Sequence, residues 1–205
     1  PSLPFNMNKK YGKQDSYFTQ MSYIKGDTNL KLTKHDIFPT PTWHIEGAPQ
    51  QLIDELYEGA YHFKERYQSE KRSNEGGYQT PILEWKEFHP QGREYVDNIV
   101  NDVLEKYAPI KVTGWWYNIS GKGDWNTPHT HPRCDYALVF YVTESDGLLR
   151  FMNPHQMRMS APDAHGSLYA KKGDIILFPS DLIHYVMPNP REEDRISISM
   201  NLQLS

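Results

Sequence analysis

The chain has 205 residues, of which 38% are hydrophobic and 23% are charged, and its formal net charge is -4. That length suits one domain with a full-sized core, and the slight acidity argues against a general binder of nucleic acid or anionic membranes. The single cysteine, Cys134, excludes an internal disulfide, and without a signal peptide or a membrane-spanning apolar run the sequence predicts a cytoplasmic protein.

The first 35 residues mix Asn, Lys, Gln, Ser and Tyr without a sustained period. We therefore expect residues 1–35 to form an N-terminal arm, and residues 36–205 to form a single folded domain. The domain is expected to begin with an edge strand from Asp36 to Ile45, because its prolines cannot donate to a central ladder.

Two helices are predicted from apolar residues that recur every three or four positions. The first opens with Pro49 and runs to Tyr67, and the second covers about 92–107 and is closed by Pro109. Each has one apolar stripe, so both should lie against a sheet. The segment 73–90 between them is rich in glycine and large aromatic residues, and it is either a covering loop or a long connection.

From Ile110 onward the pattern changes to short runs of β-branched and aromatic residues separated by Gly, Pro, Asn and Asp. The expected strands cover residues 111–119, 136–143, 148–152, 167–171, 174–178, 184–187 and 195–203. The sequence therefore predicts a mainly β domain, a sandwich or squashed barrel with both helices packed on one sheet. The polar connection 153–166 either lines a substrate entrance or is disordered.

Three histidines have the spacing of a metal site. His129 and His131 point to the same side of an extended segment, and His184 follows a buried strand that begins at Gly173. Three ligands on one side of an octahedral ion leave the opposite positions free, which lets iron bind substrate and dioxygen together. The sequence predicts a metal site at these histidines, with ordinary loop histidines as the alternative.

The last predicted strand carries a second signal. Its polar residues Arg195, Ser197, Ser199 and Asn201 share one face, and apolar residues share the other. A guanidinium with a hydroxyl two residues further on is a receptor for a carboxylate, provided that both face a cavity. The alternative is a surface strand whose polar face is solvated.

These residues resemble a known family. The run from Gly173 to Asp181 with His184, the Arg195-Ile196-Ser197 triplet, and Tyr117 ahead of His129-Thr130-His131-Pro132 resemble the Fe(II)- and 2-oxoglutarate-dependent oxygenases. The resemblance is strongest to short members of that superfamily and extends distantly to prolyl hydroxylases. By the order of elements it covers Asp36 to Leu202.

The resemblance implies a double-stranded β-helix, a jelly-roll and cupin-like core. It implies Fe(II) held by His129, His131 and His184, and 2-oxoglutarate held at its far carboxylate by Arg195 and Ser197. Tyr117 would be a further contact for the co-substrate, and Asn118 either donates to it or satisfies a strand end. No catalytic residue beyond the metal ligands is expected.

The activity that the resemblance implies is a dioxygenase reaction. Dioxygen and 2-oxoglutarate would be consumed, succinate and carbon dioxide released, and an unidentified substrate hydroxylated. That substrate is either a small molecule or a protein side chain.

The chain departs from the family at one ligand. Most relatives carry Asp or Glu two residues after the first histidine, where this chain has His131. All three histidines bind iron, or one lies outside the coordination sphere, or Asp135 folds back to supply an oxygen. With Asp135, the segment also resembles the first metal motif of cupins. The alternatives are therefore a cupin-type metalloenzyme that does not use 2-oxoglutarate, or a non-catalytic ligand-binding barrel.

Overall fold

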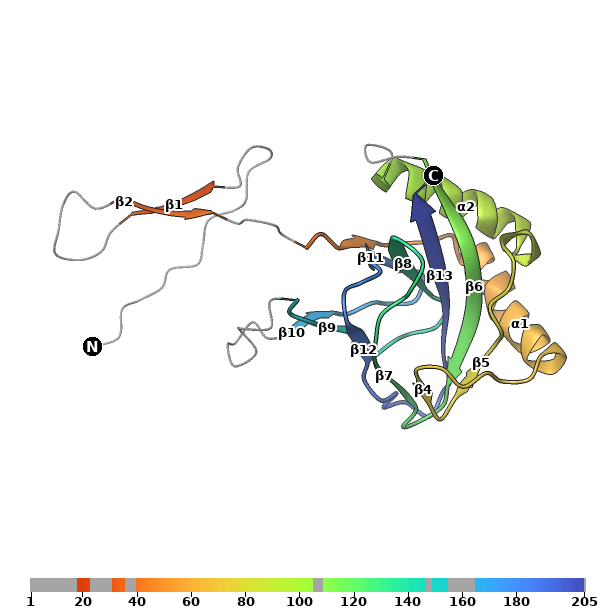
Figure 1. Cartoon of the computed structure of the whole chain (residues 1–205). Helices are drawn as coiled ribbons and strands as arrows, with labels where there is room; N and C mark the ends of the chain where they lie inside the picture. The colour runs from red at the N-terminus through yellow and green to blue at the C-terminus, as the bar shows by residue number, and fades with distance from the viewer. Residues whose placement is uncertain are drawn as a thin grey trace. The chain divides into compact units, whose positions relative to one another are not determined.

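The computed structural model describes residues 18–22, 31–35, 40–104, 109–146, 149–154 and 165–204. The chain divides into two compact units, Pro1–Thr40 and Pro41–Ser205. In the first unit, β1 (Phe18–Ser22) pairs antiparallel with β2 (Lys31–His35) (Figure 1). We predicted no element there, because these short runs lack sustained alternation of apolar and polar residues.

The second unit contains two antiparallel sheets (Figure 1). The first sheet is six-stranded, in the order β3 (Trp43–Ile45), β11 (Ile175–Pro179), β8 (Tyr136–Tyr141), β13 (Arg195–Leu204), β6 (Ile110–Ser120) and β5 (Tyr78–Gln79). The second is five-stranded, in the order β10 (His165–Leu168), β9 (Leu149–Met152), β12 (His184–Val186), β7 (Trp125–His129) and β4 (Asn74–Glu75). Two facing antiparallel sheets are the architecture of a jelly roll, which the family resemblance implied, and they fit the sandwich or squashed barrel that the strand pattern predicted.

Both predicted helices are present, and they cover one face of the six-stranded sheet (Figure 1). Helix α1 spans Gln50–Arg66 directly after Pro49, and α2 spans Pro90–Leu104, starting two residues before the predicted position. Val96, Val100 and Leu104 of α2 are almost fully buried, as the apolar stripe predicted. Residues 105–107 of the predicted second helix lie outside the described part.

The apolar residues of β13 form the sheet's side of this core. Their side chains have no exposed surface; they are Ile196, Ile198, Met200 and Leu202. They pack in the same cluster as the buried residues of both helices. The polar face of β13 therefore has to point toward the space between the two sheets.

The space between the sheets is partly packed and partly hollow. Phe151 of β9 meets Phe178 of β11 at a ring separation of 5.1 Å, within a second apolar cluster. Beside this cluster lies a cavity of about 850 Å³. The packed part fixes how the sheets face each other, and the hollow part holds the candidate site.

A tight turn positions β11. Gly173 has φ +87°, and a Cβ there would lie 2.9 Å from Cδ1 of Ile53 in α1, so only glycine fits. Asp174 closes the turn, because its Oδ2 accepts the backbone N–H of Lys171 at 2.8 Å and also contacts Nε2 of His44 at 2.8 Å. The Gly-Asp pair thus fixes both the start of β11 and its edge neighbour β3.

Some elements differ from the prediction. The edge strand is confirmed only at Trp43–Ile45, because Asp36–Pro39 lies outside the described residues. Strands β4, β5 and β7 were not predicted, since the first two are too short to show a pattern and Pro128 interrupts the third. The predicted strand 167–171 is β10, which starts two residues earlier.

The structure describes the two long connections in part. The segment 73–90 adds β4 to one sheet and β5 to the other, and it contains a 3₁₀ helix, η1 (Trp85–Glu87). It also contributes to the cavity wall, as a covering loop would. For the segment 153–166, residues 155–164 lie outside the description.

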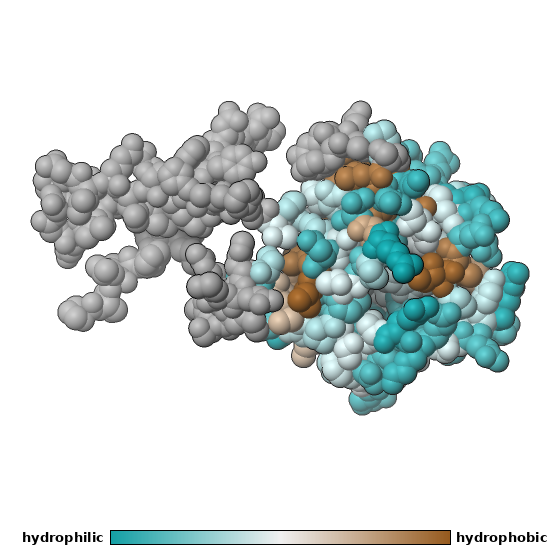
Figure 2. Space-filling view, viewed as in Figure 1, coloured by the Kyte–Doolittle hydropathy of each residue, from teal (hydrophilic) through white to brown (hydrophobic). Residues whose placement is uncertain are grey.

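On the side shown in Figure 2, hydrophilic residues dominate the coloured surface and hydrophobic residues form small separate patches. Among the described residues, no helix has the length and apolar character needed to cross a bilayer. The described residues on this side therefore form no large continuous apolar patch.

Candidate functional site

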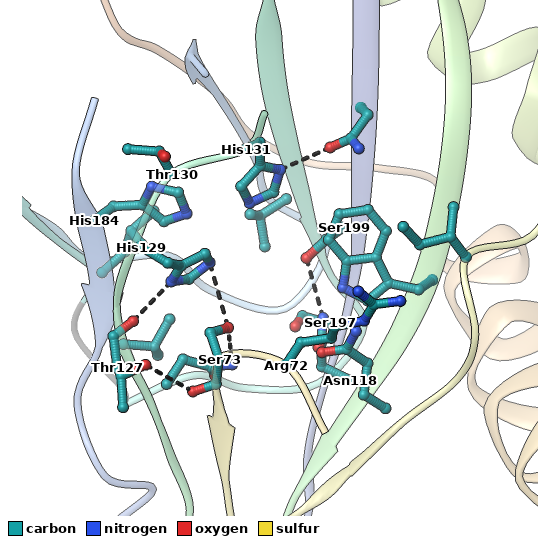
Figure 3. A pocket seen from close by; sticks show the side chains of 18 of the residues that line it. Arg72, Ser73, Asn118, Thr127, His129, Thr130, His131, His184, Ser197 and Ser199 are labelled. Atoms are coloured by element: carbon teal, nitrogen blue, oxygen red, sulfur yellow. Dashed lines mark hydrogen bonds between the residues drawn. The ribbon is translucent and has the colours of Figure 1, made fainter. Parts of the chain in front are cut away.

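The three predicted histidines converge at one point between the sheets (Figure 3). His129 ends β7, His184 begins β12, and the pairing of these strands sets the two histidines opposite each other. His131 follows two residues after His129. One ring nitrogen from each lies within 4.8 Å of the others, and the ring centroids are 4.3 to 5.4 Å apart.

Each imidazole is held in the same way by its Nδ1 atom. Nδ1 of His129 donates to the carbonyl of Thr127 at 2.7 Å, and Nδ1 of His184 donates to the carbonyl of Leu182 at 2.9 Å. Nδ1 of His131 donates to Oδ1 of Asn201 at 2.7 Å (Figure 3). Because these oxygens can only accept, the proton stays on Nδ1 and the lone pair of Nε2 is left for a ligand.

Burial also keeps these rings neutral. It lowers the pKa of His131 to about 4 and that of His184 to about 3, and it lowers the pKa of His129 as well. A neutral imidazole is the form that coordinates a metal. A set of three neutral imidazoles whose Nε2 lone pairs face one another therefore fits a divalent first-row ion such as Fe(II).

Asp135 does not join this group. Its side chain is exposed, and Oδ2 accepts the backbone N–H of Leu204 in β13 at 2.8 Å. The metal-ligand group that includes the histidines contains no carboxylate among the described residues. The structure therefore removes the basis for Asp135 as a replacement ligand, and with it the full cupin-like motif.

The polar face of β13 lines the same cavity as the histidines, as the alternation predicted. Arg195 is only 3% exposed. Its guanidinium donates to the carbonyl of Met187 at 2.9 Å and to that of Asp124 at 3.4 Å. No carboxylate of the described residues forms an ion pair with it. Buried charges are normally paired, so this cation is suited to an anion that enters the cavity.

The pKa of Arg195 is lowered by burial, and neighbouring Tyr141 and Asp124 oppose that effect. A guanidinium stays protonated at neutral pH even so. Ser197, two residues along β13, lines the cavity beside it. The predicted carboxylate receptor thus has both of its parts on one wall.

Tyr117 is not part of that wall, so its predicted contact with a co-substrate is wrong. It lies on the helix side of β6, where its hydroxyl donates to the carbonyl of Leu56 in α1 at 2.9 Å. Asn118, the next residue, does line the cavity, and its Nδ2 donates to Oγ of Ser199 at 3.0 Å. Neighbouring residues of a strand point to opposite faces, so the two could not share one pocket.

A different tyrosine occupies the cavity wall. Tyr141 of β8 lies opposite Ser197 in the sheet and lines the cavity. Burial raises its pKa, and the nearby Arg195 opposes that rise. The sequence analysis missed it because the pairing of β8 with β13 sets which strand is adjacent, and the sequence does not reveal that pairing.

Other cavity residues were also missed. Ser73 lies in the covering segment, and its Oγ is 3.4 Å from Nε2 of His129 (Figure 3). The ring of Trp116 packs against that of His131 at a centroid separation of 5.4 Å and a tilt of 37°. Arg72, beside Ser73, and Arg133, two residues after His131, also line the cavity. For Trp116 the alternation along β6 was a usable signal, whereas the others depend on loop placement.

A second convergence of metal-ligand types lies elsewhere. His44, Glu46 and Asp174 have ligand atoms within 4.8 Å of one another. His44 lies on the edge strand β3. Its contact with the buried Asp174 holds the edge strand β3 against the turn before β11, which accounts for the pair.

Comparison with protein families gives the decisive observation. Residues 114–201, which include all three histidines and Arg195, match a family described as "Putative 2OG-Fe(II) oxygenase". The matched segment covers less than half of the chain, and over that length the chain is similar to the Fe(II)- and 2-oxoglutarate-dependent oxygenases. Fe(II) and 2-oxoglutarate are the cofactors that this match supports, and oxidoreductase is the class of activity that it supports. A comparison with curated protein sequences finds no match.

Solved structures of similar fold include several oxygenases. A prolyl-4-hydroxylase from Pseudomonas putida aligns over 81% of this chain and 94% of its own, with 13% identity and a TM-score of 0.62. HygX from Streptomyces hygroscopicus, with nickel and 2-oxoglutarate bound, aligns over 81% of this chain and 84% of its own, with 13% identity and a TM-score of 0.60. These likenesses confirm the double-stranded β-helix fold of this chain.

A third neighbour has the same fold. The viral collagen prolyl hydroxylase of Paramecium Bursaria Chlorella virus-1, in complex with 2-oxoglutarate, has 14% identity and a TM-score of 0.56. It aligns over 80% of this chain and 96% of its own. A carbocyclase, SnoK of nogalamycin biosynthesis, has a TM-score of 0.62, so the fold alone does not select hydroxylation.

Proposed function

We propose that the protein is a 2-oxoglutarate-dependent dioxygenase that hydroxylates its substrate. His129, His131 and His184 hold Fe(II), and Arg195 with Ser197 holds the far carboxylate of 2-oxoglutarate. Tyr141 takes the place that we first assigned to Tyr117. The observation that carries the proposal is a buried guanidinium, without a carboxylate partner among the described residues, in the same cavity as three metal-ready imidazoles.

Arg195 is prepared for this role before any ligand arrives. Two backbone carbonyls fix its guanidinium, so little side-chain freedom is lost when a carboxylate binds. A charge-assisted bond to a carboxylate contributes about 1.5 to 3 kcal/mol, and the dry surroundings strengthen it. Asn118 supports the same wall through Ser199 and leaves Ser197 free to donate.

The charge of the histidine set also favours a dianionic co-substrate. Three neutral imidazoles bring no negative charge to a divalent ion, whereas a carboxylate ligand would cancel part of its charge. Together the ion and Arg195 carry three positive charges in a buried space. The two carboxylates of 2-oxoglutarate offset two of them.

When bound, Fe(II) and 2-oxoglutarate supply the oxidation, in which a substrate C–H bond becomes C–OH while dioxygen and 2-oxoglutarate become carbon dioxide and succinate. The chain's own residues hold the metal ligands in position and keep water out of the site. Phe178 packs against the ring of His184 at 4.6 Å, and Trp116 lies over that of His131. These aromatic neighbours keep water from the ligand atoms and hold the rings in place.

Adding Fe(II) and then 2-oxoglutarate without oxygen tests the site. We expect a weak visible charge-transfer band that requires both, and Arg195→Gln should weaken 2-oxoglutarate binding by about 10- to 100-fold through the lost charge-assisted bond. Arg191→Gln is the matched control, because Arg191 is half-buried, lies outside the cavity wall and pairs with Asp146. A protein that binds metal without the band would be a cupin-type metalloenzyme, and one without stoichiometric metal would be a binding module.

Turnover separates hydroxylation from other oxidations. With oxygen and a true substrate, succinate release should match the appearance of a product that is heavier by one oxygen atom. If the product contains no added oxygen, the reaction is a ring closure or an epimerisation and the proposed hydroxylation is wrong. Normal coupling of 2-oxoglutarate turnover in Arg195→Gln would contradict the assigned role of Arg195.

A further inference from the structure

We propose that the substrate of this oxygenase is an organic anion, and that Arg133 and Arg72 bind its acidic group at the rim of the cavity. This inference rests on the proposed function, because it assumes that Arg195 is engaged by 2-oxoglutarate. The argument comes from the volume of the cavity, from the charges on its wall, and from the state of the two arginines.

The cavity is larger than the co-substrate needs. Its volume is about 850 Å³. At about 30 Å³ per non-hydrogen atom, the volume of a water molecule in the liquid, 2-oxoglutarate would fill roughly 300 Å³. The remainder is enough for a second small organic molecule, since ligand sites typically span about 300 to 1,000 Å³.

The wall of this cavity is positive in a protein that is negative overall. The chain has a formal net charge of -4. Yet among the described residues the cavity is lined by three arginines and by no aspartate or glutamate. Low-dielectric walls concentrate such a field inside a cleft and draw in ions of the opposite sign. With Arg195 engaged, the charges of Arg72 and Arg133 remain for the second ligand.

Arg133 has two features of a residue kept for binding. Its φ is +66°, and it is the only described residue other than glycine with a positive φ. L side chains are strained in that conformation, and glycine or asparagine would occupy it more readily. Its guanidinium also has no hydrogen bond or ion pair with the rest of the described chain. The position therefore presents a free cation two residues after His131, although a different residue would make a better turn.

Arg72 faces the same cavity next to Ser73, whose hydroxyl approaches His129 (Figure 3). Its Nε and Nη2 both donate to Oε2 of Glu70, at 2.9 and 2.8 Å. This ion pair is well exposed to solvent, so the carboxylate only partly cancels the field of Arg72. Nη1 makes no bond to the described residues and is available to an incoming anion.

The test uses protein loaded with Zn(II), which is diamagnetic and redox-inert, and saturated with 2-oxoglutarate, so that no turnover occurs. The probes are benzoate, phenyl phosphate and the neutral benzamide, and the signals are the Nε–H resonances of the arginines in ¹H–¹⁵N spectra. We expect both anions to shift the Arg133 and Arg72 signals saturably, and benzamide to leave them in place. If benzoate binds more tightly than phenyl phosphate, the acidic group of the substrate is a carboxylate. The reverse order of affinity would indicate a phosphate.

Variants then distinguish binding of the anion by these two arginines from a general effect of the protein's surface charge. The double change Arg72→Gln and Arg133→Gln should weaken the anion by about tenfold or more, whereas Arg66→Gln, an exposed position on α1, should not. Glu70→Gln should tighten binding, and Glu65→Gln, also exposed on α1, should not. Arg133→Asn should lose the anion while its melting temperature stays equal or rises, because the turn is relieved.

The two proposals fail in different ways. If 2-oxoglutarate itself does not shift the Arg195 signal, the proposed function fails. If it does, but the anions leave Arg133 and Arg72 unmoved, or shift Arg66 equally, the anionic substrate alone is refuted.

Discussion

At the scale of single residues, the candidate metal site depends on what holds the second nitrogen of each ring. Two of the three anchors are backbone carbonyls within two residues of the histidine, so they follow from local chain geometry. The third is a side chain: Asn201 lies in β13, far along the sequence from His131. Substitution can therefore test only this anchor without moving the backbone.

We expect Asn201→Ala to weaken binding of Ni(II) or Fe(II) by about 10- to 100-fold, because His131 loses the acceptor that fixes its tautomer and orientation. Titration calorimetry of the metal-free protein measures this. Gln203→Ala, an exposed change on the same strand, is the matched control. Equal metal affinities in the two variants would show that the Asn201 anchor is dispensable.

At the scale of elements, β13 joins the core to the site. One face packs fully buried residues under the helices, and the other carries Arg195 and Ser197 into the cavity. A shift of this strand by one residue would exchange the two faces, so the packing of the helices fixes which side chains reach the ligand. The stability of the helix layer and the geometry of the cavity are linked through this strand.

Leu56→Ala in α1 tests the helix layer. Leu56 is 1% exposed in the core under the sheet, so its truncation should reduce the free energy of unfolding by about 2 to 5 kcal/mol. Glu58→Ala, exposed on the same helix, should change stability by less than about 0.5 kcal/mol. Urea denaturation gives both values. A small loss for Leu56→Ala would mean that the helices contribute little to the fold.

At the scale of the whole molecule, the candidate metal site lies where the two sheets meet. His129 and His184 come from the five-stranded sheet, whereas His131 is tied to β13 in the other sheet by Asn201. An ion bound by all three therefore stabilises the folded form, because the unfolded chain cannot bring the ligands together.

At a free metal concentration of 100 times Kd, binding should contribute about 2.7 kcal/mol and raise the melting temperature by roughly 5 to 10 °C. Differential scanning calorimetry with Ni(II), reversed by a chelator, measures the shift. His184→Gln should lose most of the rise, and His62→Gln, an exposed change on α1, should keep it. An unchanged melting temperature in the wild-type protein would argue against a three-histidine site.

The sequence by itself determined what local patterns encode. The period of the helices gave α1 and α2, the alternation along β13 gave its two faces, and the His-x-His spacing with His184 gave the candidate ligands. These signals are visible without the fold because each depends on neighbours within a few residues.

Only the tertiary structure decided which distant segments meet. It turned Tyr117 toward Leu56 and put Tyr141 beside Arg195, left Asp135 outside the histidine group, and brought Arg72 and Arg133 to the cavity rim. Strand pairing and loop placement set these contacts, and they depend on the packing of the entire domain rather than on any local run of residues.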